Sequence, residues 1–160
     1  MKKLKIGILG IGHNHGAAKI SELRGFGDEV EIAGVAESEK IWLEKRKSLK
    51  AYDGLTFMSE EELLSLPVLD AVFVETSVPR LVPAAEKCVK LGLHVHMDKP
   101  AGVDLKQYAK VLRTAKAKNL VFQTGYMYRY NEAFAYLRDA VKSGRLGRLY
   151  GIQTAMSTLH

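Results

Sequence analysis

The sequence predicts an α/β fold of the Rossmann type, a doubly wound parallel sheet with helices on both faces. Short β-branched apolar runs alternate with longer helical patterns along residues 1–124, as in sheets built from strand–helix–strand units. The apolar runs show little polar alternation, which is typical of strands covered on both faces. A glycine-rich turn follows the first run and opens the first helical pattern.

The predicted elements follow one another in a regular order. The strands are expected over residues 5–9, 30–36, 55–58, 70–75, 94–97 and 120–123. The helices are expected over 14–23, 39–49, 59–66, 82–91 and 104–119. Ser59 and Glu62 have the spacing of a capping box. Asp104 is a favourable N-cap residue for the last of these helices.

The pattern changes after residue 124. A helix is predicted over 131–142, ended by Ser143 and Gly144, and a strand over 149–156. That strand has no partner, and isolated domains avoid such an exposed edge. We therefore expect a Rossmann domain over 1–124, and over 125–160 the start of a second, α+β domain for substrate binding or oligomerisation whose remainder is absent.

Composition and charge argue against several classes of protein. The chain of 160 residues is 47% hydrophobic and 26% charged, as in ordinary globular proteins. No apolar run approaches the ~18 residues of a membrane span, the N-terminus lacks the form of a signal peptide, and a single, buried Cys88 fits a reducing compartment. We expect a cytoplasmic protein without membrane partners. The net charge of +6 is spread along the chain, and its densest cluster, 45–47, is interpreted as a solvated helix face, so no nucleic-acid partner is expected.

The turn after the first predicted strand carries the main chemistry. Gly10 allows a tight turn, and Gly12 allows the backbone to approach a pyrophosphate at the N-terminus of the helix. In the pattern Gly-X-Gly-X-X-Gly the third glycine would fall at position 15, where this chain has a histidine, with Gly16 one place later. The turn is predicted to bind a dinucleotide, and a generic glycine turn is the alternative. The residues expected to contact the cofactor here are Gly10, Ile11, Gly12, His13, Asn14 and His15.

An acidic residue, Glu37, ends the second predicted strand. A carboxylate at this place accepts hydrogen bonds from the ribose hydroxyls of the adenosine and repels a 2′-phosphate. NAD is therefore the predicted cofactor. Lys40 lies close enough in the sequence to keep NADP as an alternative, and Glu37 could instead only begin the next helix.

Asp98, Lys99 and Pro100 follow the fifth predicted strand. Open α/β sheets bind ligands beyond the carboxyl ends of their strands, so Lys99 is placed where a substrate meets the nicotinamide. A lysine there can donate to a substrate oxygen or help to move a proton as hydride leaves. Lys99 is thus the predicted catalytic residue. Asp98 can fix its position, both are expected to contact the cofactor, and the bond to Pro100 can be cis.

Together these motifs resemble the glucose–fructose oxidoreductase / inositol dehydrogenase family (Gfo/Idh/MocA). The resemblance covers essentially the whole chain and extends through Gly125-Tyr126-Met127-Tyr128-Arg129-Tyr130-Asn131 and Ser143-Gly144-Arg145-Leu146-Gly147. The family's Glu-Lys-Pro is Asp-Lys-Pro here. Its frequent Thr-Pro-Asn and histidine after the fourth strand are replaced by Thr76-Ser77-Val78-Pro79-Arg80-Leu81, in which Thr76 and Ser77 are still expected to contact the cofactor.

The resemblance implies a two-domain, usually oligomeric NAD(P)-dependent dehydrogenase or reductase that acts on a sugar, a polyol or a related carbonyl or alcohol, with Lys99 as its catalytic lysine. Homo-oligomerisation through the missing C-terminal domain follows from it. The family's second domain adds an Asp-X-X-X-His pair, which is not found before the last residue, His160. This stretch alone is therefore expected to bind cofactor but to catalyse poorly or not at all.

Other readings of particular side chains remain open. Tyr126 and Arg129 follow the sixth strand and serve either as substrate contacts or in packing between domains. The pairs 13/15 and 94/96 are two His-X-His motifs, but no cysteine or acidic ligand set adjoins them in the sequence, so no metal site is predicted. Trp42, Tyr108 and Phe134 are interpreted as core residues.

A second class of function is a non-catalytic NAD(H)-binding or interaction module. A natural gene product of roughly 300 residues or more would favour the dehydrogenase, and a stop after position 160 would favour the module.

Overall fold

The computed structural model describes residues 2–155 and 157. The chain divides into two compact units, Met1–Gly125 and Tyr126–His160. Within the described part of the chain, no helix is both long and apolar enough to cross a bilayer. The boundary that the sequence predicts, between 124 and 125, lies one residue from the division in the structure. A role of the second unit in substrate binding or oligomerisation stays a prediction.

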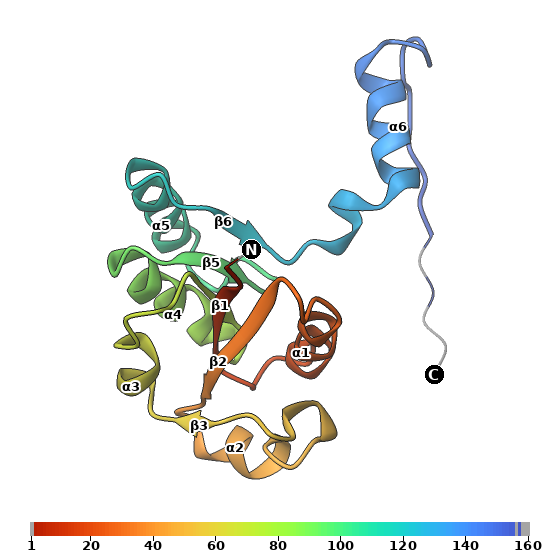
Figure 1. Cartoon of the computed structure of the whole chain (residues 1–160). Coiled ribbons are helices and arrows are strands. Elements are labelled where there is room, and N and C mark those ends of the chain that lie inside the picture. The colour runs from red at the N-terminus through yellow and green to blue at the C-terminus, as the bar shows by residue number, and fades with distance from the viewer. Residues whose placement is uncertain (1, 156, 158–160) are drawn as a thin grey trace. The chain divides into compact units, whose positions relative to one another are not determined.

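The first unit is built on a six-stranded parallel sheet in the order β3-β2-β1-β4-β5-β6 (Figure 1). Its strands are β1 (Leu4–Leu9), β2 (Val30–Ala36), β3 (Phe57–Met58), β4 (Ala71–Val74), β5 (His94–Met97) and β6 (Phe122–Thr124). The strand order reverses between β1 and β4, which is the topological switch point where open α/β sheets bind ligands. This arrangement confirms the predicted Rossmann fold.

Helices cover both faces of the sheet (Figure 1). They are α1 (Gly16–Gly25), α2 (Lys40–Arg46), α3 (Glu60–Leu64), α4 (Val78–Lys90) and α5 (Leu105–Ala117), with a short 3₁₀ helix η1 (Lys50–Tyr52). One apolar cluster joins β4 and β5 to α4 and α5, and a second joins β1 and β2 to α1 and η1. Ile8, Val72 and Val74 are fully buried between these layers, as the unbroken apolar runs predict.

The first turns of two helices form as the sequence predicts. Ser59 Oγ accepts from the Glu62 N–H at 3.1 Å, and the Glu62 carboxylate accepts from the Ser59 N–H at 2.7 Å, which completes the capping box. Asp104 caps α5 by accepting from the Lys106 N–H at 2.8 Å. Cys88 is buried in α4, and burial raises the pKa of its thiol to about 12. It is therefore a small core residue, as expected, and no nucleophile.

Several boundaries differ from the prediction. Helix α4 begins at Val78, four residues early, because Pro79 fits the first turn of a helix, where its missing N–H has no partner to lose. The pattern over 39–49 yields the shorter α2, and β3 keeps only two residues. Tyr108 and Trp42 are both partly buried, and each packs against one of the two apolar clusters.

The second unit contains the 3₁₀ helix η2 (Met127–Tyr130) and the helix α6 (Glu132–Lys142), capped by Asn131. The strand predicted over 149–156 is wrong for its described residues: 149–155 form no strand and pair with none of the six strands of the sheet. Met156 lies outside the described residues. The interpretation of Phe134 as core is also wrong. Phe134 is 47% exposed, because so short a unit cannot bury it. Its ring centroid lies 5.2 Å from that of Tyr128.

Candidate functional site

The glycine turn packs directly on the loop that follows β4. Gly10 has a φ of +90°, and a Cβ at this residue would lie 2.5 Å from the backbone nitrogen of Thr76. A Cβ on Gly12 would lie 2.9 Å from the backbone nitrogen of Ser77. Both positions therefore require glycine, and the turn is held against the switch point of the sheet.

The side chain of Glu37 lies beside this turn. Its carboxylate accepts from the backbone N–H of Ile11 at 2.7 Å and from that of Glu39 at 2.7 Å. The acid that ends β2 thus fixes the turn as well as facing it. Each carboxylate oxygen can accept a further hydrogen bond, so the group keeps capacity for a ligand hydroxyl.

Arg46, at the end of α2, is a residue of this site that sequence reasoning missed. Its guanidinium donates to the carbonyl of Ile11 at 3.0 Å, to Asn14 Oδ1 at 2.7 Å and to the carbonyl of His13. It also stacks on the ring of Trp42, 4.8 Å from the ring centroid. The prediction of a solvated basic face is therefore wrong for Arg46, because α2 turns this residue toward the glycine turn.

Four titratable side chains meet where the loops after β1, β4 and β5 come together. We call His13, His15, Glu75 and Asp98 the histidine–carboxylate cluster. Asp98 Oδ2 lies 3.3 Å from His13 Nδ1 and 3.0 Å from His15 Nδ1, and Glu75 Oε2 lies 3.8 Å from His13 Nδ1. The backbone N–H of His13 also donates to the carbonyl of Glu75 at 2.7 Å. Both carboxylates are fully buried and His13 is 8% exposed.

Burial and mutual charge set the protonation of this cluster. Burial, and next the charge of Asp98, raise the pKa of Glu75 to about 9. Burial also acts to raise the pKa of Asp98, but the Lys99 N–H and the two imidazoles outweigh it and bring that pKa below its usual value. Burial lowers the pKa of His13, against the opposing charge of Asp98. At neutral pH, Asp98 is therefore the anion of the cluster and Glu75 holds a proton.

Lys99 follows β5 at the same edge of the sheet. Its backbone N–H donates to Asp98 Oδ1 at 2.5 Å, and its bond to Pro100 is cis. The ammonium forms no hydrogen bond or ion pair with the described residues, so it is available to a ligand. Thr76 is buried, and Ser77 Oγ donates to Glu39 Oε2 at 2.6 Å. The structure thus brings Thr76, Ser77, Asp98 and Lys99 to the glycine turn.

Four predicted side chains remain. Tyr126 and Arg129 belong to the second unit, and their role stays a prediction. His94 Nδ1 accepts from the Val121 N–H at 2.9 Å, and His96 stacks on Phe73 with ring centroids 4.5 Å apart. These two histidines have the hydrogen-bonded and packed roles that were expected.

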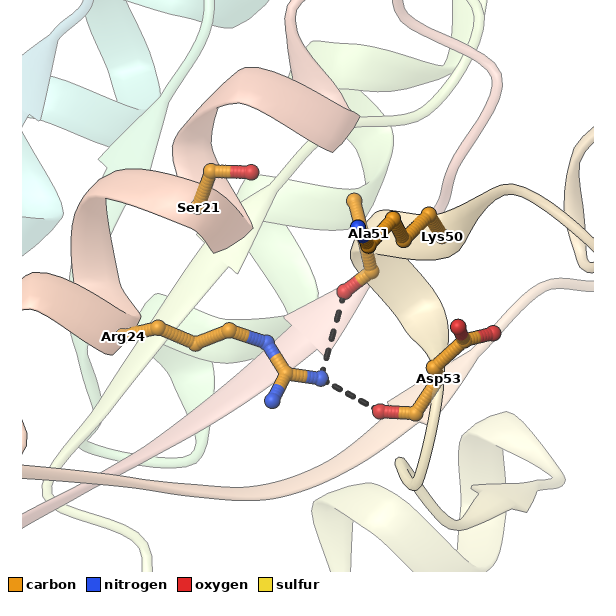
Figure 2. A pocket seen from close by; sticks show the side chains of 5 residues that line it. All are labelled: Ser21, Arg24, Lys50, Ala51 and Asp53. Atoms are coloured by element: carbon orange, nitrogen blue, oxygen red, sulfur yellow. Dashed lines mark hydrogen bonds between the residues drawn. The ribbon is translucent and has the colours of Figure 1, made fainter.

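A pocket of about 480 Å³ lies between α1 and η1, away from the glycine turn (Figure 2). The guanidinium of Arg24 crosses it and donates to the carbonyls of Ala51 at 3.3 Å and Asp53 at 2.5 Å (Figure 2). Because the charge of Arg24 is used to hold η1 against α1, this hollow has a structural explanation.

Residues 4–126 match the model of an oxidoreductase family with an NAD-binding Rossmann fold, GFO_IDH_MocA. The chain belongs to the Gfo/Idh/MocA family. It is 26% identical over 153 residues to the myo-inositol 2-dehydrogenase of Thermotoga maritima, covering 91% of this chain and 42% of that protein. It is 29% identical over 147 residues to the inositol 2-dehydrogenase of Streptomyces avermitilis, again covering 91% and 42%.

Solved structures show the same fold. The WlbA dehydrogenase of Bordetella pertussis, crystallised with NADH and UDP-GlcNAcA, superposes with a TM-score of 0.78 at 20% identity, covering 93% of this chain and 45% of that one. The scyllo-inositol dehydrogenase of Lactobacillus casei, crystallised with NAD(H) and scyllo-inositol, gives 0.74 at 23% identity, covering 91% and 43%. This Gfo/Idh/MocA chain therefore spans less than half the length of the relatives it matches.

Proposed function

We propose that this chain is the cofactor-binding half of an NAD-dependent dehydrogenase or reductase that acts on a sugar, a polyol or a related carbonyl or alcohol. The observation that carries the proposal is the glycine turn at the switch point, with Glu37 beside it and Lys99 at the same edge. Backbone amides at the start of α1 take up the diphosphate, and Glu37 accepts from the adenosine ribose. Relatives named as inositol dehydrogenases support the substrate class.

The surroundings of Glu37 favour NAD over NADP. A 2′-phosphate at this carboxylate would be repelled unless a free cation adjoined it. Arg46 on α2 is one candidate, but its guanidinium is used by the carbonyls of the turn. Lys40 forms an ion pair with Glu44 at 3.7 Å. Both basic residues thus have other partners.

The NAD assignment predicts a selective effect at Glu37. In a fluorescence titration of the chain with NADH, Glu37→Gln is expected to weaken binding by about tenfold or more and to narrow the preference over NADPH, because hydrogen bonds to a charged acceptor are lost. Glu44→Gln is the control: it also removes one negative charge, but from α2 and without changing the glycine turn. It should bind NADH like the wild type. Tighter binding of NADPH than NADH by the wild type would contradict the assignment.

The proposal extends to the rest of the predicted site and to the setting of the protein. Lys99 donates to the reacting oxygen while hydride passes between the nicotinamide and the substrate carbon. Tyr126 and Arg129 are proposed substrate contacts, since they directly follow the Rossmann unit. A homo-oligomer is proposed from the family resemblance. A cytoplasmic location agrees with a single, buried cysteine.

A further inference from the structure

Arg46 binds the carbonyl groups of the glycine turn. Its Nη1 donates to the carbonyl of Ile11 at 3.0 Å and to that of His13, and its Nη2 donates to Asn14 Oδ1 at 2.7 Å. The ring of Trp42, with its centroid 4.8 Å from the guanidinium carbon, supports the same group. Because these contacts involve three residues of the turn, they fix the guanidinium and the turn relative to each other.

Peptide geometry extends the effect of Arg46 to the N–H groups of the turn. In a planar trans peptide, the C=O of one residue and the N–H of the next point in opposite directions. The Ile11 carbonyl shares its trans peptide group with the Gly12 N–H. The His13 carbonyl shares its trans peptide group with the Asn14 N–H. Since both carbonyls are directed at Arg46, both of these N–H groups are directed away from it.

The same two N–H groups are the free donors among residues 11–14. The N–H of Ile11 donates to a carboxylate and that of His13 to a carbonyl, both at 2.7 Å. The N–H groups of Gly12 and Asn14 form no hydrogen bond with any described residue. Gly12 is a buried residue, and backbone N–H groups at such places almost always have an acceptor. The Gly12 N–H therefore needs an acceptor that the described residues do not supply.

We propose that Arg46 is a positioning residue of the cofactor site, which holds the glycine turn with its N–H groups at 12 and 14 directed at the diphosphate. This inference rests on the proposed function, since the diphosphate belongs to NAD(H). Donors that are fixed before a ligand arrives lose little conformational freedom when they bind it. Arg46 acts through the turn, so its role does not require contact with the cofactor.

The proposal is tested by titrating the ¹⁵N-labelled chain with ADP, and separately with adenosine, and following the amide signals by NMR. ADP carries the diphosphate, whereas adenosine has only the ribose that Glu37 is expected to bind. In the wild type, ADP should shift the amide signals of residues 12 and 14 more than those of residues 11 and 13, whose N–H groups already have acceptors.

Substitution of Arg46 should affect ADP selectively. Arg46→Gln is expected to weaken ADP binding by about 10- to 100-fold, because hydrogen bonds to a charged acceptor are lost, and to change the affinity for adenosine by less than about twofold. Arg46→Lys should weaken ADP binding by only about 3- to 10-fold, because an ammonium keeps the charge but lacks the planar fork that reaches both carbonyls. Lys45→Gln is the matched control and should bind ADP like the wild type. Lys45 is exposed on the same helix, and its ammonium lies 5.7 Å from the centroid of the Trp42 ring.

The proposal is overturned if Arg46→Gln binds ADP as tightly as Lys45→Gln does. It is also overturned if Arg46→Gln weakens ADP and adenosine equally, because a merely structural role would affect both ligands. The amide spectra show whether each variant is folded. Should Arg46→Gln unfold, Arg46→Lys decides the question, since it must bind ADP more weakly than Lys45→Gln. A wild type that binds neither ADP nor NADH would refute the proposed function itself, and this inference with it.

Discussion

Replacing Gly10 with alanine is expected to destabilise the first unit by about 3–5 kcal/mol, a value that belongs to severe backbone strain and overpacking. Two costs add at this residue. The backbone has a φ of +90°, which alanine adopts only with strain, and the new Cβ would lie 2.5 Å from the backbone nitrogen of Thr76. Because the obstacle is backbone at the end of β4, it cannot move aside as a flexible side chain would.

Gly92→Ala separates these two costs. Gly92 has a φ of +84°, and a Cβ there meets nothing within 4 Å, so only the conformational cost of about 1–2 kcal/mol is expected. The free energy of unfolding is measured for both variants by urea denaturation. Equal losses at Gly10 and Gly92 would show that the turn does not press on the β4 loop, and the close packing described above would be wrong.

Replacing Lys99 with methionine is expected to lower the rate of hydride transfer by about 100- to 10,000-fold, the range spanned by a lost general acid or base. The methionine keeps the length of the side chain but cannot donate to an alkoxide or carbonyl oxygen. NADH affinity should change by less than about threefold, because the lysine acts on the substrate and not on the diphosphate. The rate is measured on the natural gene product with a panel of inositols and hexoses, following NADH absorbance.

Lys106→Met is the control for this change, since Lys106 is exposed at the start of α5. It should retain the wild-type rate. If Lys99→Met turned over at the wild-type rate while binding NADH normally, the lysine would have no part in the chemistry. If it lost NADH binding instead, its role would be in holding the cofactor.

The sheet could be predicted from the sequence because local pattern and tertiary structure agree there. Apolar runs such as 70–75 carry no polar alternation, so they fit only a sheet covered on both faces, and the glycine turn after the first run fixes the direction of the first crossover. The carboxyl edge of a parallel sheet then gathers Gly10, Glu37 and Lys99 although they lie far apart in the chain.

The contacts of Arg46 and of the cluster could not be predicted in this way. A helical pattern gives the face of the helix on which Arg46 lies, but not where α2 ends or which residues Arg46 contacts. Because its neighbours in the sequence are also basic, a solvated surface was the simpler interpretation. Glu75 offered a weak signal, since it is a charged residue that ends an otherwise apolar strand. Its meeting with His13 and Asp98 depends on the register of three strands, which local sequence does not specify.

The strand expected over 149–156 shows the opposite failure. Its alternation is compatible with a strand, but strands form by pairing, and residues 149–155 pair with no described strand. A period-two pattern therefore predicts a capacity for strand formation that this chain does not use.

A crystal of the chain grown with excess NADH tests most directly whether the N-terminus of α1 takes up the dinucleotide. The diphosphate is expected against the glycine turn at Gly12, because the N–H groups of Ile11 and His13 already donate to Glu37 and to the carbonyl of Glu75. The adenosine ribose hydroxyls are expected within hydrogen-bonding distance of Glu37. Electron density for the cofactor anywhere else on the molecule, or none at saturating NADH, would contradict that assignment.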